Sequence, residues 1–296
     1  MTNVSTPSSG LWSVRRSFRD GNRHRRPAVC GVFGGPFVTE TVIAVLGLGE
    51  AGGLIAAGLV AAGATVQGYD PQVAPPAGVR AAGSDAEACA GASIVLSVNS
   101  AADAADALRD SLPSLAPGTI WADLNTATPG LKETLAALGG QTVRVVDVAL
   151  MSPVPGRGLH TPMTASGPAA AEFAVALGEY GATVTVLEGP VGAAATRKLL
   201  RSVFYKGMAA AVTEALTAAR AAGLEEWLRG NIRDELIRAN ADTLDRLVDG
   251  SIKHAVRRRD EMAAATELLE DLGVPPRIAP AARDILANLA EREKPS

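Results

Sequence analysis

Three glycines in one short loop are the residues best suited to bind a ligand. The loop reads Gly47-Leu48-Gly49-Glu50-Ala51-Gly52; it follows the apolar run 42–46 and precedes a stretch of small residues typical of a helix. In such a loop the first glycine allows a tight turn, the second lets the backbone approach a pyrophosphate, and the third lets helix and strand pack closely. The helix start supplies free N–H groups and a positive dipole end. The pattern predicts dinucleotide binding; the alternative is a strand–helix turn without a ligand.

Asp70 stands at the end of the next predicted strand, residues 64–69. A carboxylate at this position accepts hydrogen bonds from the ribose hydroxyls and repels a 2′-phosphate. The sequence therefore favours NAD as the cofactor. NADP is not excluded, because Arg80 follows beyond a proline-rich loop. A second interpretation is that Asp70 and Pro71 only end the strand.

Two further loops should face the same crevice, because ligands bind at the carboxyl ends of parallel strands. The first is Ser97-Val98-Asn99, which we expect to contact the cofactor. The second contains Asn125, which we expect to contact the substrate. Its neighbours Thr126 and Thr128 have an alternative role, since either could cap a helix that begins ahead of Glu133.

The elements that must position these residues alternate between strand and helix. Apolar runs predict strands at 42–46, 64–69, 93–98, 119–123 and 143–148, with two more at 163–166 and 182–187. Helices are expected at 50–62 and from near Pro168. This alternation is typical of right-handed βαβ units, so the predicted fold class is α/β, a doubly wound, mostly parallel Rossmann sheet.

After Gly189 the strand pattern ends and only helices are expected. Residues 191–222 read as one long helix that is apolar nearly all round, so we expect it to be buried between domains or subunits. A last amphipathic helix is expected at about 280–293. The sequence thus predicts a dinucleotide-binding domain at 41–188 and an all-helical domain for substrate binding and dimerisation at 189–296.

The composition excludes several classes of protein. The net charge is −3 and no apolar run reaches the ~20 residues that cross a bilayer, so neither a nucleic-acid nor a membrane partner is expected. Two cysteines, Cys30 and Cys89, cannot build a disulfide framework, and no Cys/His cluster suggests a metal. We therefore expect no metal and a reducing compartment, the cytoplasm.

Residues 1–40 differ from the remainder of the chain. They hold six arginines against Asp20 and Glu40, are rich in Ser, Gly and Pro, and show no hydrophobic period. We expect a disordered leader that the folded protein can lose. Its Arg/Ser bias faintly resembles a transit peptide, and a basic tail that contacts RNA or a membrane is a further alternative.

Taken together, the motifs between 42 and 287 resemble those of the β-hydroxyacid dehydrogenases, the superfamily of the 3-hydroxyisobutyrate, tartronate semialdehyde and 6-phosphogluconate enzymes. The glycine loop has Ala51 where that family usually has Met. The D-x-S-T-x-x-P segment corresponds to residues 123–129, with Asn125 replacing the serine. The substrate loop is matched only loosely by residues 147–153, which include Met151 and Ser152. The G-x-x-G-x-G-x-x-x-K run corresponds to 189–198 and retains two glycines and Lys198.

The resemblance implies that Lys198 is the general acid/base, with Met151 and Ser152 near the substrate. Burial readily tunes the pKa of a lysine in a dry cleft. On a helix, Ser202 and Tyr205 share the face of Lys198, and Arg201 lies to one side. The alternative is a lysine that snorkels from a buried helix.

Departures from the family pattern leave the substrate open. Arg201 and Ser202 stand where the family has an Asn-Asn or His-Asn pair, and a second family lysine is replaced near Asp260-Glu261-Met262. The Pro153–Gly158 loop and the His254–Arg258 run are typical of a less characterised branch. The family resemblance, together with the apolar helix, also implies a homodimer.

Three hypotheses remain at this point. The first is reversible oxidation of a small β-hydroxy acid, or reduction of the matching semialdehyde or ketone, with Lys198 as acid/base and Arg201 clamping a carboxylate. The second is an imine reductase, although the retained lysine weighs against it. The third is a catalytically silent dinucleotide-binding protein.

Overall fold

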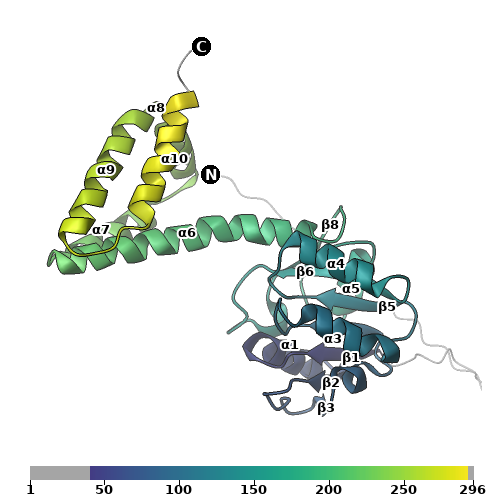
Figure 1. Cartoon of the computed structure of the whole chain (residues 1–296). Coiled ribbons are helices and arrows are strands. Elements are labelled where there is room, and N and C mark those ends of the chain that lie inside the picture. The colour runs from purple at the N-terminus through teal and green to yellow at the C-terminus, as the bar shows by residue number, and fades with distance from the viewer. Residues whose placement is uncertain (1–40, 293–296) are drawn as a thin grey trace, which may run out of the picture. The chain divides into compact units, whose positions relative to one another are not determined.

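The computed structural model describes residues 41–292, and the expectations for residues 1–40 lie outside this range. The described chain contains an eight-stranded sheet followed by a series of helices (Figure 1). The predicted α/β class with a C-terminal helical region is confirmed.

The sheet has the strand order β3-β2-β1-β4-β5-β6-β7-β8. All neighbours are parallel except β6 and β7, which are antiparallel. Every predicted strand is present, and the two-residue edge strand β3 was not predicted. The strands are β1 Val42–Leu46, β2 Thr65–Tyr69, β3 Arg80–Ala81, β4 Ile94–Ser97, β5 Thr119–Asp123, β6 Val143–Leu150, β7 Met163–Ser166 and β8 Val184–Leu187.

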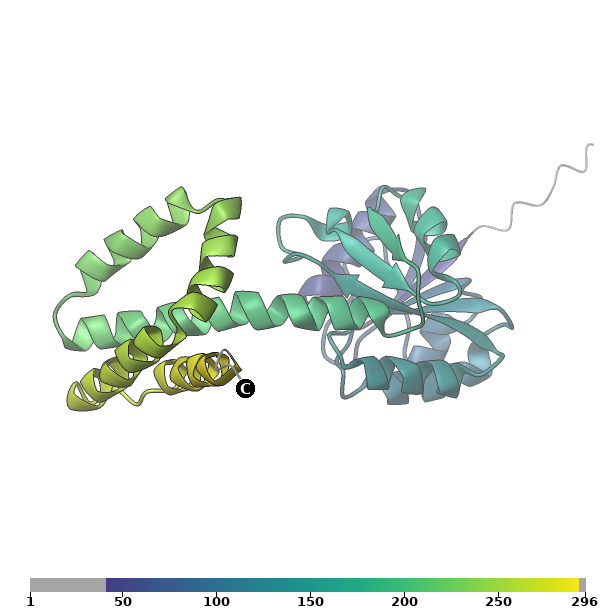
Figure 2. The ribbon, with the colours of Figure 1, turned by 90° about the horizontal axis from the view of Figure 1, so that it is seen from above.

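Helices cover both faces of this sheet, as Figure 2 shows. One face packs against α1 and α5, which contribute Ile55 and Phe173 to its core. The other packs against α2, α3 and α4, where Leu108 and Leu135 are fully buried with Trp121 of β5. Because alternate residues of a strand point to opposite faces, buried strands of this kind are apolar on both sides. The helices are α1 Glu50–Ala61, α2 Asp85–Cys89, α3 Ala104–Ser111, α4 Pro129–Gly139 and α5 Ala170–Gly178, with 3₁₀ turns at Leu112–Ser114 and Gly158–His160.

The C-terminal part is helical throughout. It comprises α6 Ala193–Ala221, α7 Glu225–Arg238, α8 Ala241–Lys253, α9 Ala255–Asp271 and α10 Ile278–Arg292. Glu214 of α6 accepts hydrogen bonds from the backbone N–H groups of Arg277, Ile278 and Ala279, and so caps the start of α10. Within residues 41–292, no helix is long and apolar enough to span a membrane.

The long helix α6 corrects one expectation. It begins at Ala193 rather than Val191, and its buried residues lie near its two ends. In the middle, Leu200, Val203 and Phe204 are 66%, 74% and 56% exposed. The helices that follow α6 do not cover this stretch within one chain, so its burial between domains or subunits stays a prediction.

Candidate dinucleotide and catalytic site

The glycine loop has the geometry that its sequence predicts. Gly47 has a φ of 87° and donates its N–H to the carbonyl of Tyr69, and a Cβ there would lie 2.6 Å from the nitrogen of Asn99. A Cβ on Gly52 would lie 1.8 Å from the Gly47 carbonyl oxygen. Both positions therefore require glycine for the fold. At Gly49, by contrast, a Cβ would meet nothing within 4 Å, so open space adjoins the loop.

The start of α1 fits an anion. Glu50 and Ala51 form its first turn, and no described side chain caps it. Gly47 and Gly49 line a cavity of about 490 Å³ together with Asp70, Val98 and Asn99. A free helix start beside open space is the usual cradle of a pyrophosphate, so the residues present fit a dinucleotide. Leu48 is buried behind the loop and does not line this cavity.

Asp70 has a structural role beyond the predicted contact with ribose. One carboxylate oxygen accepts the N–H of Leu48 at 2.8 Å, and the other accepts those of Gln72 and Val73. Burial opposes the charge of Asp70, but these three hydrogen bonds outweigh it and hold the pKa of the carboxyl below its usual value. Asp70 therefore stays ionised and fixes the glycine loop to the end of β2.

The cavity is strongly acidic on the side of α2 and α3. Besides Asp70 it is lined by Asp85, Asp103, Asp106 and Asp110, and no Lys or Arg of the described residues lines it. Burial, and the nearby charges of Asp110 and Asp70, raise the pKa of Asp85 to about 6. Arg80, considered as a phosphate ligand, is not among the lining residues.

Four polar residues form a row across the centre of the sheet. Ser97 is the register partner of Asp123, Asp123 of Asp147, and Asp147 of Ser166. All four are fully buried at 0% exposure. Two neighbouring carboxylates without water require a counter-charge.

Lys132 of α4 supplies that charge. Its ammonium donates to Asp123 Oδ2 at 2.5 Å and to the carbonyls of Asp123 and Asn125 at 2.9 Å. It also lies 3.2 Å from Asp147 Oδ1, an ion pair without hydrogen-bond geometry. Thr128 accepts the N–H of Leu131 and caps α4, so the capping role considered for it is confirmed. The cap fixes the first turn of α4, on which Lys132 lies.

Asn125 joins this row to the glycine loop. Its side-chain amide donates to Asp123, to the hydroxyl of Ser97 and, at 2.8 Å, to Asn99 Oδ1. Ser97 does not line the cavity itself; its hydroxyl donates to Asn99 and so supports a residue that does. Of the predicted cofactor loop, Val98 and Asn99 line the cavity and Ser97 lies behind them.

The opposite end of the row holds the start of α6. Asp147 Oδ2 accepts the N–H groups of Gly192 at 3.1 Å and Ala195 at 2.8 Å, and the Ser166 hydroxyl accepts that of Ala194 at 3.0 Å. Gly192 has a φ of 101°, and a Cβ there would lie 3.2 Å from Pro129. This explains why the motif before Lys198 retains its glycine.

Lys198 lies one helical turn beyond these anchored residues and is half-buried. Burial lowers its pKa, and the positive charges of Lys132, Lys206 and Arg201 lower it further, against a raising effect of Asp147. A lysine in this environment is neutral in a larger fraction at neutral pH, which suits proton transfer.

The other predicted substrate residues lie along α6 and after β6. The Arg201 guanidinium stacks 4.3 Å from the ring centroid of Tyr205, and Ser202 is half-buried. Met151 packs against the small apolar cluster at the start of α6, and Ser152 follows it. Asn125, in contrast, is only 7% exposed and belongs to the buried network.

The sequence did not single out Lys132 or Ser166. It pointed to Asp123 and Asp147 only as the first residues of two family motifs. A signal was present, because Asp123 ends one buried apolar run and Asp147 lies within another, and both runs were predicted to be strands. Their need for a cation could have pointed to Lys132, which lies in the first turn of the helix that follows β5.

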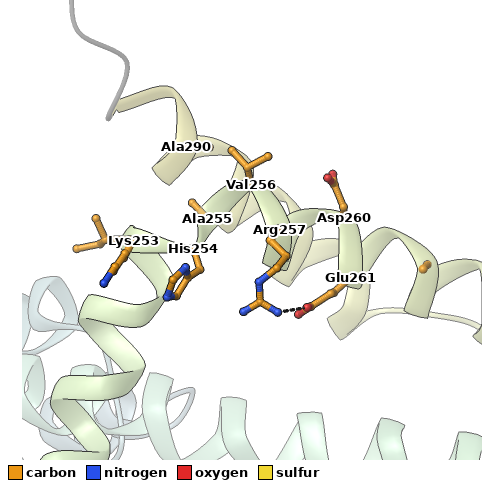
Figure 3. A pocket seen from close by; sticks show the side chains of 10 residues that line it. Lys253, His254, Ala255, Val256, Arg257, Asp260, Glu261 and Ala290 are labelled. Carbon is orange, nitrogen blue, oxygen red and sulfur yellow. Dashed lines mark hydrogen bonds and ion pairs between the residues drawn. The ribbon is translucent and has the colours of Figure 1, made fainter.

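A larger cavity than the one beside the glycine loop lies elsewhere, between the C-terminal helices (Figure 3). It measures about 920 Å³ and is lined by residues of the His254–Arg258 run, including Arg257, which is paired with Glu261. Neither the glycine loop nor Lys198 lines it, so we do not assign it to the site.

Comparison with known families agrees with the geometry. A family described as the NAD binding domain of 6-phosphogluconate dehydrogenase matches residues 42–157. Residues 42–157 are therefore similar to this NAD-binding domain. A domain of unknown function (DUF1932) matches residues 219–289, and the predicted resemblance to β-hydroxyacid dehydrogenases with a divergent C-terminal part is confirmed. Among curated proteins no significant match was found.

Solved structures share the fold over most of the chain. A conserved hypothetical protein from Sinorhizobium meliloti 1021 is 28% identical with a TM-score of 0.55, over 84% of this chain and 88% of that chain. A protein of unknown function, described as structurally similar to 3-hydroxyacid dehydrogenases, is 25% identical with a TM-score of 0.54, over 84% and 97%. An imine reductase from Myxococcus stipitatus, in complex with NADP+, has a TM-score of 0.71 at 18% identity, over 85% and 95%. The last shows a common fold alone.

Proposed function

We propose that the protein is an NAD-dependent oxidoreductase that interconverts a small β-hydroxy acid and its semialdehyde or ketone, with Lys198 as general acid/base. The observation that carries the proposal is the buried polar network. It ties Asn99, beside the glycine loop, to the first turn of α6, and Lys198 follows one turn later. Hydrogen bonds and ion pairs thus connect Asn99 with the helix that bears Lys198, the lysine whose pKa burial lowers.

The residues for the cofactor are those of the glycine loop, with Asp70, Val98 and Asn99. A bound nicotinamide dinucleotide supplies the hydride acceptor or donor. We favour NAD because the cavity presents five aspartates and no basic side chain of the described residues, and carboxylates repel a 2′-phosphate. NADP remains the alternative, since the imine reductase from Myxococcus stipitatus was solved with NADP+.

Lys198 exchanges the proton of the substrate hydroxyl. In oxidation the neutral amine takes this proton, and in reduction the ammonium returns it. Arg201, Ser202 and Tyr205 extend along the same helix, and a guanidinium can hold a carboxylate through two parallel hydrogen bonds. The stacking of Arg201 on Tyr205 limits the orientations of the guanidinium and so prepares it for such a ligand.

Residues 41–188 are, in this proposal, the cofactor domain, and residues 189–296 bind substrate and form a homodimer. The exposed apolar side chains of α6 support the dimer, because large exposed apolar patches are typical of interaction surfaces. A reducing cytoplasm remains the proposed location.

The test is a panel of short hydroxy acids, their oxidised forms and cyclic imines, assayed with both cofactors by the absorbance of the reduced nicotinamide. We expect turnover of at least one hydroxy acid with NAD, and slower turnover with NADP. Turnover of imines alone would instead indicate an imine reductase. Tight binding of NADH without turnover of any compound would favour a silent dinucleotide-binding protein.

A further inference from the structure

Lys132 is a buried cation that the proposed reaction does not use. Its side chain is 1% exposed, and its ammonium contacts oxygens of Asp123, Asn125 and Asp147. Burial of a lysine is costly unless it is paired and hydrogen-bonded, and Lys132 has both kinds of partner. Lys132 of α4 therefore contacts both β5 and β6, and a change at this residue would affect both strands.

Through Asp147, the charge of Lys132 acts on the start of α6. Oδ1 of Asp147 faces the ammonium, while Oδ2 accepts the N–H groups of Gly192 and Ala195. Without Lys132, the carboxylates of Asp123 and Asp147 would be unscreened register neighbours in the sheet and would repel each other. This repulsion would push Asp147 away from Asp123 and weaken its hydrogen bonds to the start of α6.

We infer that Lys132 is a positioning residue for Lys198: it holds Asp147 against the first turn of α6, and Lys198 lies on the next turn of the same helix. Lys198 follows Ala194 by four residues and Ala195 by three, so it lies on the face that these anchored residues share. For its catalytic consequence, this inference rests on the proposed function.

Lys132 also contributes to the electrostatic potential at Lys198 and so to the pKa of Lys198. The charged groups that act on Lys198 are Lys132 from α4, Asp147 from β6, and Lys206 and Arg201 from its own helix. Loss of the Lys132 ammonium removes a repulsive charge and leaves the attractive one of Asp147. The pKa of Lys198 should therefore rise, and a pH–rate profile governed by Lys198 should move toward alkaline pH.

The experiment is NMR titration of full-length protein labelled in its lysines, which stand only at positions 132, 198, 206, 253 and 294. Lys198→Ala assigns the resonance. In wild type, Lys198 should titrate at lower pH than a lysine in an unstructured peptide. In Lys132→Met the Lys198 pKa should rise, and amide hydrogen exchange at Ala194 and Ala195 should accelerate.

Lys206→Met is the matched control. It also removes a positive charge near Lys198, but Lys206 is exposed and takes no part in the hydrogen bonds of the buried network. It should raise the Lys198 pKa by less than Lys132→Met and leave exchange at Ala194 and Ala195 unchanged. Lys253→Met should change neither.

Should Lys132→Met fail to fold, the double variant Asp123→Asn/Lys132→Met removes the cation with its nearest carboxylate. Asp147 keeps its bonds to α6 in this variant, and the Lys198 pKa should still rise. An unchanged Lys198 pKa in either folded variant, or a wild-type Lys198 that titrates like a lysine in an unstructured peptide, would overturn the inference. None of these measurements uses a substrate, so they test the inference about Lys132 separately from the proposed activity. The proposed activity is tested by the turnover of Lys198→Ala.

Discussion

Lys132 Nζ lies 3.2 Å from Asp147 Oδ1, and both side chains are completely buried. Asp147 is at the same time the anchor of α6, so one carboxylate joins the centre of the sheet to the helix that bears Lys198. Asp123 and Asp147 carry two negative charges, and Lys132 neutralises only one of them. The backbone N–H groups and the positive dipole end at the start of α6 offset the other. The relation explains how the start of the long helix that bears Lys198 is held against the sheet.

Lys198→Ala should reduce kcat by ~10²–10⁴, the usual range for loss of a general acid/base. Cofactor affinity should change little, because the glycine loop and Asp70 lie on other elements. Turnover is measured by the absorbance of the reduced nicotinamide, and NADH affinity by calorimetry. Near-wild-type turnover with a true substrate would remove the acid/base role, and the exposed Lys253→Ala serves as control.

Arg201→Ala should chiefly raise KM, with a larger loss for carboxylate substrates than for uncharged ones. Arg201→Lys should restore binding only in part, because an ammonium lacks the two-pronged geometry of a guanidinium. Tyr205→Leu, which removes the stacking partner, should have a smaller effect in the same direction. Equal losses for charged and uncharged substrates would contradict the clamp.

The sequence predicted those parts of the site that depend on local pattern. Strand β5 was predicted at its observed bounds, and the glycines at 47 and 52 have the steric roles assigned to them. The row of Ser97, Asp123, Asp147 and Ser166 was not predicted, because it depends on strand register, which no local pattern specifies. Burial of Lys132 was missed for a related reason: a lysine in a first helical turn is normally solvated. The middle of α6 was predicted to be buried between domains or subunits, and its apolar content does not reveal which of these would cover it.

Gly49→Val should abolish NADH binding while the protein stays folded. The added side chain would enter the open space beside the loop, where a Cβ meets nothing within 4 Å. Gly52→Ala is the contrasting variant, since its Cβ would lie 1.8 Å from the Gly47 carbonyl oxygen, and we expect a large loss of Tm. Calorimetry and thermal unfolding separate the two effects. Unchanged NADH affinity in Gly49→Val would refute the assignment of the loop.

The protein should sediment as a dimer at micromolar concentration. A large apolar area is exposed to solvent in the single chain. It comprises the side chains of Leu200, Val203 and Phe204 on α6 and of Trp227 on α7. Val203→Glu should weaken the dimer, because a charge would enter the interface, whereas Glu179→Lys at the end of α5, which packs on the sheet, should not. A stable wild-type monomer would contradict a homodimer built on α6.

Asp85 should make stability depend on pH in a direction opposite to that of most carboxylates. Its pKa is raised from 3.8 to about 6 in the folded protein by burial, Asp110 and Asp70, so folding favours the protonated form. This contribution to stability is complete below about pH 4 and is lost as the pH rises through 6. Asp85→Asn should therefore raise the free energy of unfolding at pH 7 by roughly 1–2 kcal/mol, after allowance for solvent screening. The gain should shrink toward zero as the pH falls to about 4.

Urea unfolding of wild type and variant across this range measures the difference directly, and the exposed Asp249→Asn on α8 should show no such trend. A gain that is independent of pH would mean that the carboxyl charge of Asp85 is not its source.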